Sequence, residues 1–418
     1  MTYDIVIIGG GPGGCAAARE GARHGKKIAL IEYENTEKLK VGGTCLHSGC
    51  IPTKAFYAAT TKNLSFSEAR SQAQKTIETL HNDLFDSLSG QKNITLINGR
   101  AHITSDAHVK VNNETLETKS IIIATGSRPF IPEAYTKAHD KIKVLTNESV
   151  FTLNEVPKRL AIIGGGYIGC EWAHIFAHYG STVTIVESQG DILLSEDKDV
   201  SREVKRAYTH RGITILTEMK SINYDEYDAV LIATGRSANI EDLGLDECGV
   251  VHTQYGIVVD EHMMSTVKGI YAVGDCIDKD YRLAHVAEHE GIIAARHALG
   301  IEARMSYHSI PSTLFTSPQI MRVGKREKDF PAEAYIMGRS WLKANGRALC
   351  EDNSVGFVKI LADAKGTILG AASVGNCDLH EVVVAMTAGM NIQEFAEIIR
   401  FHPSTNEAIR DAARKVVE

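Results

Sequence analysis

The sequence predicts an α/β protein with two doubly wound parallel sheets and a C-terminal α+β domain. Three observations lead to this fold class. A pattern of strand, glycine turn, helix and strand occurs twice, each copy is closed by an apolar strand ending in Ala-Thr-Gly, and the last third of the chain carries short strands followed by helices. With 418 residues, 44% of them hydrophobic, the chain is long enough for several cores.

The first copy of the pattern opens the chain. An apolar strand over residues 3–8 leads into Gly9-x-Gly11-x-x-Gly14, a helix of small residues and a second strand that ends at Glu32. Such glycines allow a tight turn and a close approach to a pyrophosphate, whose charge the helix N-terminus stabilises. The acid accepts hydrogen bonds from a ribose diol. The turn therefore predicts a dinucleotide site.

The second copy repeats the first with the same spacing. A strand over residues 159–163 precedes Gly164-x-Gly166-x-x-Gly169, and the next strand ends at Glu187. One such motif is weak support for a nucleotide site, but two copies with matching strands, helices and acids argue against ordinary glycine turns. Glu187 would repel a 2′-phosphate, so this site is expected to take NADH rather than NADPH.

Two further segments resemble each other. Residues 121–126 and 230–235 are apolar strands that end in Thr125-Gly126 and Thr234-Gly235, typical of buried parallel strands running into a turn. A later strand over residues 269–273 ends at Gly274-Asp275. The Asp275 carboxylate is placed there to bind a cofactor hydroxyl.

The most informative segment is Gly-Gly-Thr-Cys45-Leu-His-Ser-Gly-Cys50-Ile-Pro-Thr-Lys54. Two cysteines on one turn of helix can close into a strained, reducible disulfide. Pro52 predicts the first position of a helix whose positive end lowers the pKa of Cys50. Lys54 follows on the same face, and His47 is expected in a loop. The other cysteines are interpreted as small buried hydrophobes: Cys15, Cys170, Cys248, Cys276, Cys350 and Cys377.

The overall charge and the chain's start exclude several function classes. A net charge of −7 without a long Lys/Arg run argues against nucleic acid or anionic lipid as a partner. The N-terminus runs straight into a strand, and no apolar stretch approaches the ~20 residues of a membrane span. The cysteine spacing offers no zinc motif, so no metal is expected. These features favour a cytoplasmic protein with a catalytic cysteine pair.

A family resemblance rests on two specific motifs. They are Gly-Gly-Thr-Cys-x4-Cys-Ile-Pro-x-Lys and, near the C-terminus, His402-Pro-Ser-Thr-Asn-Glu407. Along its whole length the chain resembles the class I pyridine nucleotide-disulfide oxidoreductases, closest to the dihydrolipoamide dehydrogenase branch. The resemblance implies Rossmann-like FAD and NAD domains, a C-terminal dimerisation domain, and a homodimer acting on a small dithiol or disulfide.

The resemblance also implies a role for each matching residue. Cys50 matches the thiol beside the flavin, and Cys45 matches the interchange thiol that attacks the substrate. Lys54 and Glu171 match an ion pair near the flavin. His402 matches the acid–base catalyst, which acts on the cysteines of the other subunit, and Glu407 matches the acid that orients it about one helical turn inside the following helix.

The implied cofactor sites and domains complete this prediction. The FAD set is Gly9, Gly11, Gly14, Glu32, Lys54, Thr125, Gly126 and Asp275, and the NAD set is Gly164, Gly166, Tyr167, Gly169, Glu187 and Gly235. The expected domains are 1–150 (FAD, first part), 151–236 (NAD), 237–303 (FAD, return) and 304–418 (interface). In the interface domain we expect strands at 309–315, 334–342, 356–361 and 370–374, then helices at 381–390 and 392–399.

Departures from the family pattern leave the substrate open. The second unit is short before residue 228, the helical hairpin near residues 55–90 is trimmed, and Tyr167 matches a gating tyrosine of the glutathione branch. Dihydrolipoamide is the first expectation. Another small disulfide, such as glutathione or coenzyme A disulfide, and a redox sensor with weak turnover are the alternatives. The absence of cysteines after Cys377 disfavours mercuric and thioredoxin reductases. The lipoamide branch raises a 2-oxo-acid dehydrogenase complex as a candidate partner.

Overall fold

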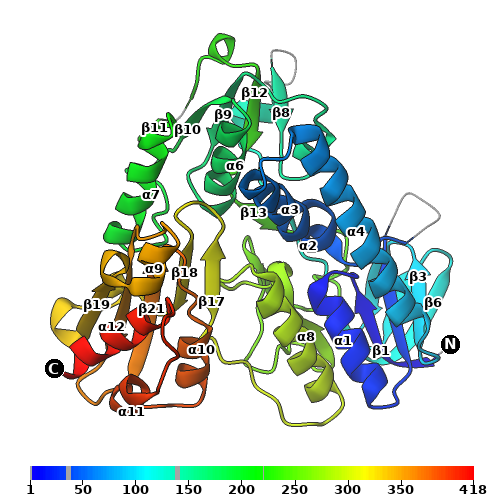
Figure 1. Cartoon of the computed structure of the whole chain (residues 1–418). Coiled ribbons are helices and arrows are strands. Elements are labelled where there is room, and N and C mark those ends of the chain that lie inside the picture. Colours follow the sequence, from blue (N-terminus) through cyan, green and yellow to red (C-terminus); the bar gives the residue numbers. More distant parts are fainter. Residues whose placement is uncertain (1, 34–38, 137–141, 220) are drawn as a thin grey trace. The chain divides into compact units, whose positions relative to one another are not determined.

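The computed structural model describes residues 2–33, 39–136, 142–219 and 221–418 (Figure 1). The chain forms two compact units. The first comprises Met1–Ile131, Thr146–Asn154 and Gly235–Ser306, and the second comprises Pro132–Leu145, Glu155–Thr234 and Tyr307–Glu418.

The first unit is built on a seven-stranded sheet in which β3, β2, β1, β6, β5 and β4 follow one another and β16 also pairs with β6. The strands β3, β2, β1, β6 and β16 are parallel, whereas β4 and β5 join antiparallel. Buried Ile and Val fill β1 and the end of β6, as expected for strands covered on both faces. The bounds are β1(Thr2–Ile8), β2(Ile28–Glu32), β3(Ile94–Asn98), β4(Ala101–Ser105), β5(His108–Val111), β6(Glu114–Ile123) and β16(Ile270–Ala272).

Two short antiparallel pairs and several helices complete the first unit. Helix α1 packs along α8. Glycines let the two helices approach closely, because a side chain at Gly291 would clash with the Gly13 carbonyl oxygen. The pairs are β7(Ser127–Pro129) with β13(Arg236–Ala238) and β14(His252–Thr253) with β15(Gly256–Ile257). The helices are α1(Pro12–Arg23), α2(Gly43–Ser48), α3(Cys50–Thr61), α4(Phe66–Ser89), η1(Val150–Thr152), η3(Gly274–Cys276) and α8(Ala284–Ala298).

The second unit begins with a five-stranded parallel sheet in the order β11-β10-β9-β12-β8. Its central strands β9 and β12 are again runs of buried aliphatic residues. The bounds are β8(Lys143–Leu145), β9(Arg159–Ile163), β10(Thr182–Val186), β11(Thr214–Leu216) and β12(Ala229–Ile232), with helices α5(Glu133–Thr136), α6(Tyr167–His178), α7(Lys198–His210) and η2(Tyr224–Glu226).

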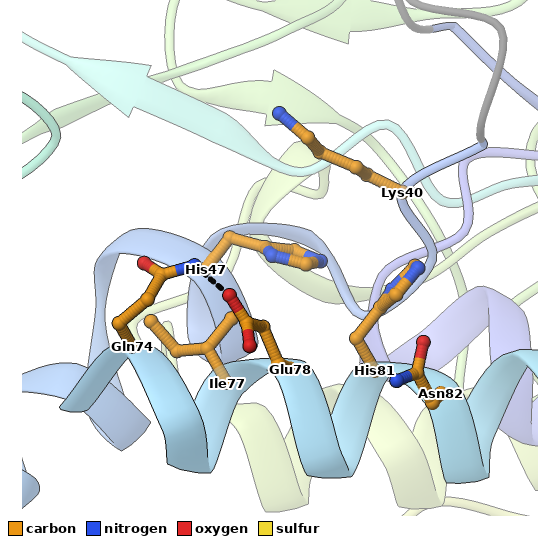
Figure 2. Close-up of a pocket in the computed structure, with 7 residues that line it drawn as sticks. All are labelled: Lys40, His47, Gln74, Ile77, Glu78, His81 and Asn82. Carbon is orange, nitrogen blue, oxygen red and sulfur yellow. Dashed lines mark hydrogen bonds between the residues drawn. The ribbon is translucent and has the colours of Figure 1, made fainter. Parts of the chain in front are cut away.

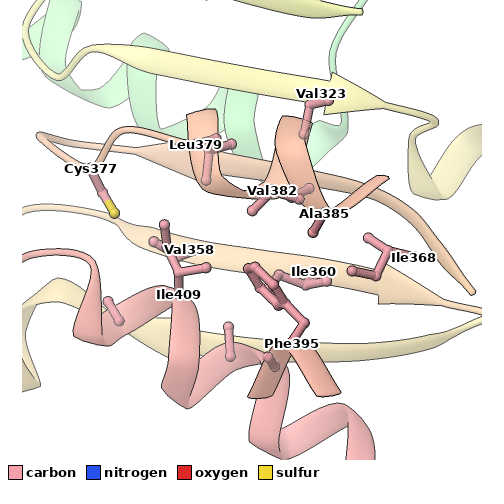
Figure 3. Close-up of a cluster of buried hydrophobic side chains, with 14 of the residues drawn as sticks. Val323, Val358, Ile360, Ile368, Cys377, Leu379, Val382, Ala385, Phe395 and Ile409 are labelled. Atoms are coloured by element: carbon pink, nitrogen blue, oxygen red, sulfur yellow. The ribbon is translucent and has the colours of Figure 1, made fainter. Parts of the chain in front are cut away.

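The C-terminal part of the second unit is an antiparallel sheet in the order β17-β18-β21-β20-β19. Its apolar face packs against helices α10 to α12, and Figure 3 shows Val358, Ile360, Phe395 and Ile409 in that core. The bounds are β17(Pro311–Leu314), β18(Ile320–Gly324), β19(Ile336–Trp341), β20(Phe357–Ala362), β21(Ile368–Val374), α9(Gly346–Cys350), α10(His380–Thr387), α11(Ile392–Glu397) and α12(Glu407–Val417), with short helices η4(Glu327–Asp329), η5(Ala332–Ala334) and η6(Leu342–Ala344).

The observed architecture confirms the predicted α/β fold class. Each of the four predicted C-terminal strands and both predicted helices overlap an observed element. Strand β18 was missed, because it is short, follows the turn sequence Thr-Ser-Pro and carries Arg322 in its middle. The boundaries of the four predicted domain segments stay a prediction.

Candidate functional site: a redox cysteine pair and two glycine turns

The two predicted dinucleotide turns have the same geometry. Helix α1 begins at Pro12 after Gly11, and α6 begins at Tyr167 after Gly166. A side chain at Gly14 would clash with the Gly9 carbonyl oxygen, and the equivalent change at Gly169 would clash with that of Gly164. The third glycine of each motif therefore lets the helix pack tightly against its own turn.

The acid at the end of the second strand holds each turn. One carboxylate oxygen of Glu32 accepts a hydrogen bond from the Gly10 N–H at 2.7 Å, and Glu187 accepts one from Gly165 at 2.7 Å. The other Glu187 oxygen accepts from the Gln189 N–H at 2.9 Å. Both acids thus stand beside their glycine turns, where a ribose is expected.

Both turns fit a dinucleotide. A side chain at Gly11 or Gly166 would meet no atom within 4 Å, so open space faces each helix N-terminus. Neither helix has an acidic residue in its first turn, and neither start carries a side-chain cap. The uncapped N–H groups and the helix dipole therefore suit the negative charge of a pyrophosphate.

The two redox cysteines lie on consecutive helices. Cys45 is on α2, Gly49 interrupts the helix, and Cys50 is the first residue of α3. The prediction of one shared helical turn was wrong, as was the place of Pro52, which is the third residue of α3 instead of the first. The reason is that Gly49 has a non-helical backbone. The helix start at Cys50 itself agrees with the expected placement of a thiol at a positive helix end.

The electrostatics differ between the two sulfur atoms. The structure has both side chains as thiols, with Cys45 half-buried and Cys50 exposed. A hydrogen bond with Cys50 raises the pKa of the Cys45 thiol well above its usual value, burial raises it further, and the charge of Lys54 opposes both effects. The Cys45 thiol therefore holds its proton more strongly than an ordinary cysteine does.

The remaining cysteines divide into two groups. Cys15, Cys170, Cys276 and Cys377 are buried as predicted. Cys248 is half-buried and Cys350 is exposed, so the prediction of a buried hydrophobe was wrong for these two. Cys350 ends the short helix α9, where its side chain faces outward.

His402 and Glu407 were predicted as a catalytic pair, and the two side chains contact each other. Nδ1 of His402 lies 3.1 Å and 3.2 Å from the two Glu407 oxygens, and the Ser404 N–H donates to the same carboxylate at 3.0 Å. The Ser404 hydrogen bond, followed by the His402 contact, lowers the pKa of Glu407. Because a carboxylate accepts from Nδ1, Nε2 is left for proton exchange. Glu407 is the first residue of α12 rather than one turn inside it, because the helix starts directly after Asn406, which occupies the N-cap position.

Lys54 and Glu171 belong to different units. Lys54 lies on α3, and its charge reaches Cys45. Glu171 is a buried residue of α6, whose carboxylate accepts a hydrogen bond from the Phe315 N–H at 3.1 Å. Their predicted pairing stays a prediction.

Asp275 lies in a polar cluster that contains a residue missed from the sequence. Ser127 donates to the Asp275 carboxylate at 2.6 Å, and Arg236 donates to the Ser127 hydroxyl at 2.7 Å. Arg236 also donates to Asn147 at 3.1 Å, and Asn147 donates to the Ser48 carbonyl at the end of α2. Burial lowers the pKa of Arg236, and the Asp275 charge opposes this. Arg236 therefore links Asp275 to the cysteine-bearing helix.

A sequence signal for Arg236 existed in the repeated Ala-Thr-Gly segments, since an arginine follows both glycines closely.

Thr125 donates to the Asn239 carbonyl at 2.6 Å, and Gly126 has a positive φ of 67° that suits the turn. Gly235 belongs to the first unit, where its carbonyl accepts from the Phe130 N–H at 3.0 Å. Its assignment to the NAD set stays a prediction.

A cavity of about 360 Å³ borders the redox helix α2 on the side of α4 (Figure 2). His47 lies on α2 and not in a loop as predicted, and its Nε2 donates to the Val41 carbonyl at 2.9 Å. His81 on α4 directs Nδ1 to the same carbonyl at 3.4 Å. The full lining is Lys40, His47, Gln74, Ile77, Glu78, His81 and Asn82.

Three carboxylates in the second unit lie around one lysine side chain. Asp197, Asp199 and Glu327 bring their oxygens together. Lys359, whose side chain is 1% exposed, lies 2.8 Å from both aspartates and also contacts Glu327. The lysine supplies the positive charge that such a cluster needs, so the group is explained as a buried ion network.

Comparison with known sequences gives the family. The family model described as pyridine nucleotide-disulphide oxidoreductase matches residues 3–291, and the dimerisation domain of the same family matches residues 310–413. The dihydrolipoyl dehydrogenase of Chlamydia muridarum is 32% identical over all of this chain and 97% of its own length. A dihydrolipoyl dehydrogenase of Staphylococcus aureus is also 32% identical, with the same coverage.

Solved structures agree with this assignment. The HOCl-induced flavoprotein disulfide reductase RclA from Escherichia coli matches with a TM-score of 0.88 and 28% identity, covering 99% of both chains. LpdA from Mycobacterium tuberculosis matches with a TM-score of 0.90 and 25% identity, also covering 99% of both chains.

The comparisons confirm the cofactors that were predicted from the sequence. Enzymes of the matched family use FAD and NAD(H), the cofactors that the family resemblance implied. Within the described ranges, no helix combines the length and apolar character that crossing a membrane requires. The sequence match over the whole chain and the agreement in fold show that this chain is a flavoprotein disulfide oxidoreductase belonging to the pyridine nucleotide-disulphide oxidoreductase family.

Proposed function

We propose that this enzyme oxidises dihydrolipoamide with NAD⁺ through the Cys45–Cys50 pair. The observation that supports the proposal best is the arrangement of the pair: Cys50 starts a helix, and Cys45 is in hydrogen-bond contact with it. Glu187 beside the second glycine turn favours NAD⁺ over NADP⁺. The 32% identity to dihydrolipoyl dehydrogenases supports dihydrolipoamide as the dithiol.

The proposed reaction starts from the Cys45–Cys50 disulfide. One substrate thiolate attacks the Cys45 sulfur, the bond between the cysteines breaks, and Cys50 leaves as a thiolate at the helix start. His402 takes the proton of the second substrate thiol through Nε2. That thiolate attacks the mixed disulfide, so the substrate leaves as a disulfide and Cys45 is released. The substrate loses two electrons, and the cysteine pair gains them.

The remaining groups support this exchange. Glu407 holds His402 in the tautomer that leaves Nε2 open and stabilises the positive ring. Lys54 offsets the negative charge of the reduced pair, consistent with its effect on the Cys45 pKa. FAD supplies the two-electron carrier between the cysteines and NAD⁺. The proposed FAD contacts are the first glycine turn, Glu32, Lys54, Thr125, Gly126 and Asp275.

The proposal includes a homodimer in which His402 of one subunit serves the cysteines of the other. Residues 310–413 match a dimerisation domain. Close to His402 in the chain, Ile399 is 95% exposed and Phe401 is 77% exposed within one chain. Such a group of apolar side chains beside a catalytic histidine suits a subunit interface.

A second candidate is an NADH-dependent reductase of another small disulfide. Tyr167 stands inside the second glycine turn, as in the glutathione branch, and the chain is 28% identical to a protein titled HOCl-induced flavoprotein disulfide reductase. Both candidates use the same cysteines and histidine in opposite directions.

A substrate comparison tests the proposal. NAD⁺ reduction by dihydrolipoamide is measured beside NADH oxidation by lipoamide, glutathione disulfide and coenzyme A disulfide, all with the FAD-loaded protein. The proposal predicts the highest kcat/KM for the lipoamide pair. A higher kcat/KM for another disulfide would contradict it in favour of the second candidate, and slow turnover with all of them would indicate a redox sensor.

A further inference from the structure

The two glycine turns fix the first residue of their helices by different means. In the first copy this residue is Pro12, whose ring presets the helical φ and has no N–H to satisfy. In the second copy it is Tyr167, which has neither property. In other respects the two turns are equivalent. Each has an acid that accepts from the turn, a third glycine where a side chain would clash, and open space at its second glycine, Gly11 or Gly166. The second turn therefore needs another constraint.

The Tyr167 side chain supplies a contact with no counterpart at Pro12. Its hydroxyl donates to Glu196 Oε1 at 2.6 Å and lies 3.3 Å from the Ser312 hydroxyl on β17. Burial raises the pKa of the Tyr167 phenol, which therefore stays protonated and able to donate. The first turn of α6 is thus tied to the loop before α7 and to the antiparallel sheet of the same unit.

Glu196 itself is held by an arginine. Arg322 on β18 donates through Nε to the same Oε1 at 3.2 Å, and its Nη1 donates to the Gly324 carbonyl at 3.0 Å. The Glu196 side chain is 1% exposed and that of Arg322 is 12% exposed. Among the described residues, the second Glu196 oxygen has no hydrogen-bond partner. The hydrogen bonds of this buried carboxylate therefore all serve Tyr167 and Arg322.

We propose that Glu196, held by Arg322, is a positioning residue that latches Tyr167 and so fixes the pyrophosphate-binding turn of the NAD site. The Tyr167–Glu196 hydrogen bond, called the latch below, restrains the second turn as the proline ring restrains the first. It also keeps the tyrosine ring in one place, whereas a gating tyrosine has to swing aside. The inference rests on the proposed role of the second glycine turn in binding NAD(H).

The latch predicts a selective defect. Glu196→Leu and Tyr167→Phe each remove the hydrogen bond, and each is expected to raise the dissociation constant of NADH roughly tenfold, the size of a hydrogen bond to a charged group. Glu196→Gln keeps an acceptor oxygen and is expected to stay close to the wild type. Both variants remove the same hydrogen bond. The double variant Tyr167→Phe/Glu196→Leu should therefore bind NADH no more weakly than either single variant.

A matched control separates the latch from a general loss of stability. Glu20 on α1 is another buried carboxylate, 7% exposed, and it pairs with Arg296 at 2.6 Å in the first unit. Glu20→Leu removes a comparable pair away from the second turn and should leave the NADH dissociation constant unchanged. FAD content is measured for every variant, so that only loaded protein is compared.

The test is stopped-flow reduction of the bound flavin at increasing NADH concentration, with reduction by dihydrolipoamide as a second readout. The wild type must first be reduced by NADH, since failure there overturns the proposed function and not the latch. The latch predicts weaker NADH binding in Tyr167→Phe and Glu196→Leu with unchanged reduction by dihydrolipoamide. Wild-type NADH binding in Tyr167→Phe, or additive losses in the double variant, would overturn it. Tyr167→Phe is the smaller change and decides the question if Glu196→Leu fails to fold.

Discussion

The contact between His402 and Glu407 gives the sharpest prediction about the chemistry. Glu407→Gln keeps the size of the side chain but removes the charge that lies 3.1 Å and 3.2 Å from Nδ1. A hydrogen bond to a charged group contributes about 1.5–3 kcal/mol. The His402 side chain is 78% exposed within one chain, so solvent screening favours the lower end of that range. At about 1.4 kcal/mol per tenfold change, kcat/KM for dihydrolipoamide should fall roughly tenfold.

The assay compares the two half-reactions. Reduction of the flavin by NADH does not involve His402 in the proposed mechanism, so its rate should stay at the wild-type value. Glu397→Gln, an equal change of charge at an exposed residue that ends α11, is the control and should leave both rates unchanged. Wild-type turnover of dihydrolipoamide in Glu407→Gln would refute the role of the pair. An equal loss in both half-reactions would point to a folding defect instead.

Two further predictions concern the glycine turns and a buried histidine. Gly169→Ala places a methyl group against the Gly164 carbonyl and should weaken NADH binding while the FAD content stays the same. Gly14→Ala should instead lower the FAD content, which is read from absorbance. Equal effects of the two variants on FAD content would contradict the assignment of the two turns. Burial, and then the charge of Arg211, lowers the pKa of His174 from 6.5 to about 3. Since the unfolded chain takes up this proton first, stability should fall as pH drops from 6.5 towards 3, by at most about 1.4 kcal/mol per pH unit. His174→Gln should flatten that slope in urea unfolding, and an unchanged slope would contradict the prediction.

Much of the fold follows from local patterns in the sequence. The runs of Ile and Val at β1, β6 and β9 are apolar enough to mark strands buried on both faces, and the glycine motifs mark the turns between them. The antiparallel sheet is less evident, since β18 holds a charged residue, Arg322, whose side chain is 12% exposed and pairs with Glu196. Such a pairing joins residues far apart in the chain and leaves no local signal.

The candidate site likewise contains residues that short sequence motifs predict and residues that such motifs do not reveal. The cysteine pair, the glycine turns and the contact between His402 and Glu407 depend on short motifs and were predicted by position. Arg236 was missed, because its importance comes from a chain of contacts through Ser127 and Asn147. The break at Gly49 was also missed, since a glycine between two helix-forming segments is compatible with either one helix or two.

The most direct test of the central claim is NAD⁺ reduction by dihydrolipoamide in the wild type and in Cys45→Ser, with NADH reduction of the flavin measured on the same samples. We predict turnover in the wild type. In Cys45→Ser we predict the loss of that turnover while NADH still reduces the flavin, because only the exchange of the dithiol needs the Cys45 sulfur. Dihydrolipoamide turnover that persists in Cys45→Ser would contradict the account, since the electrons would then bypass the cysteine pair.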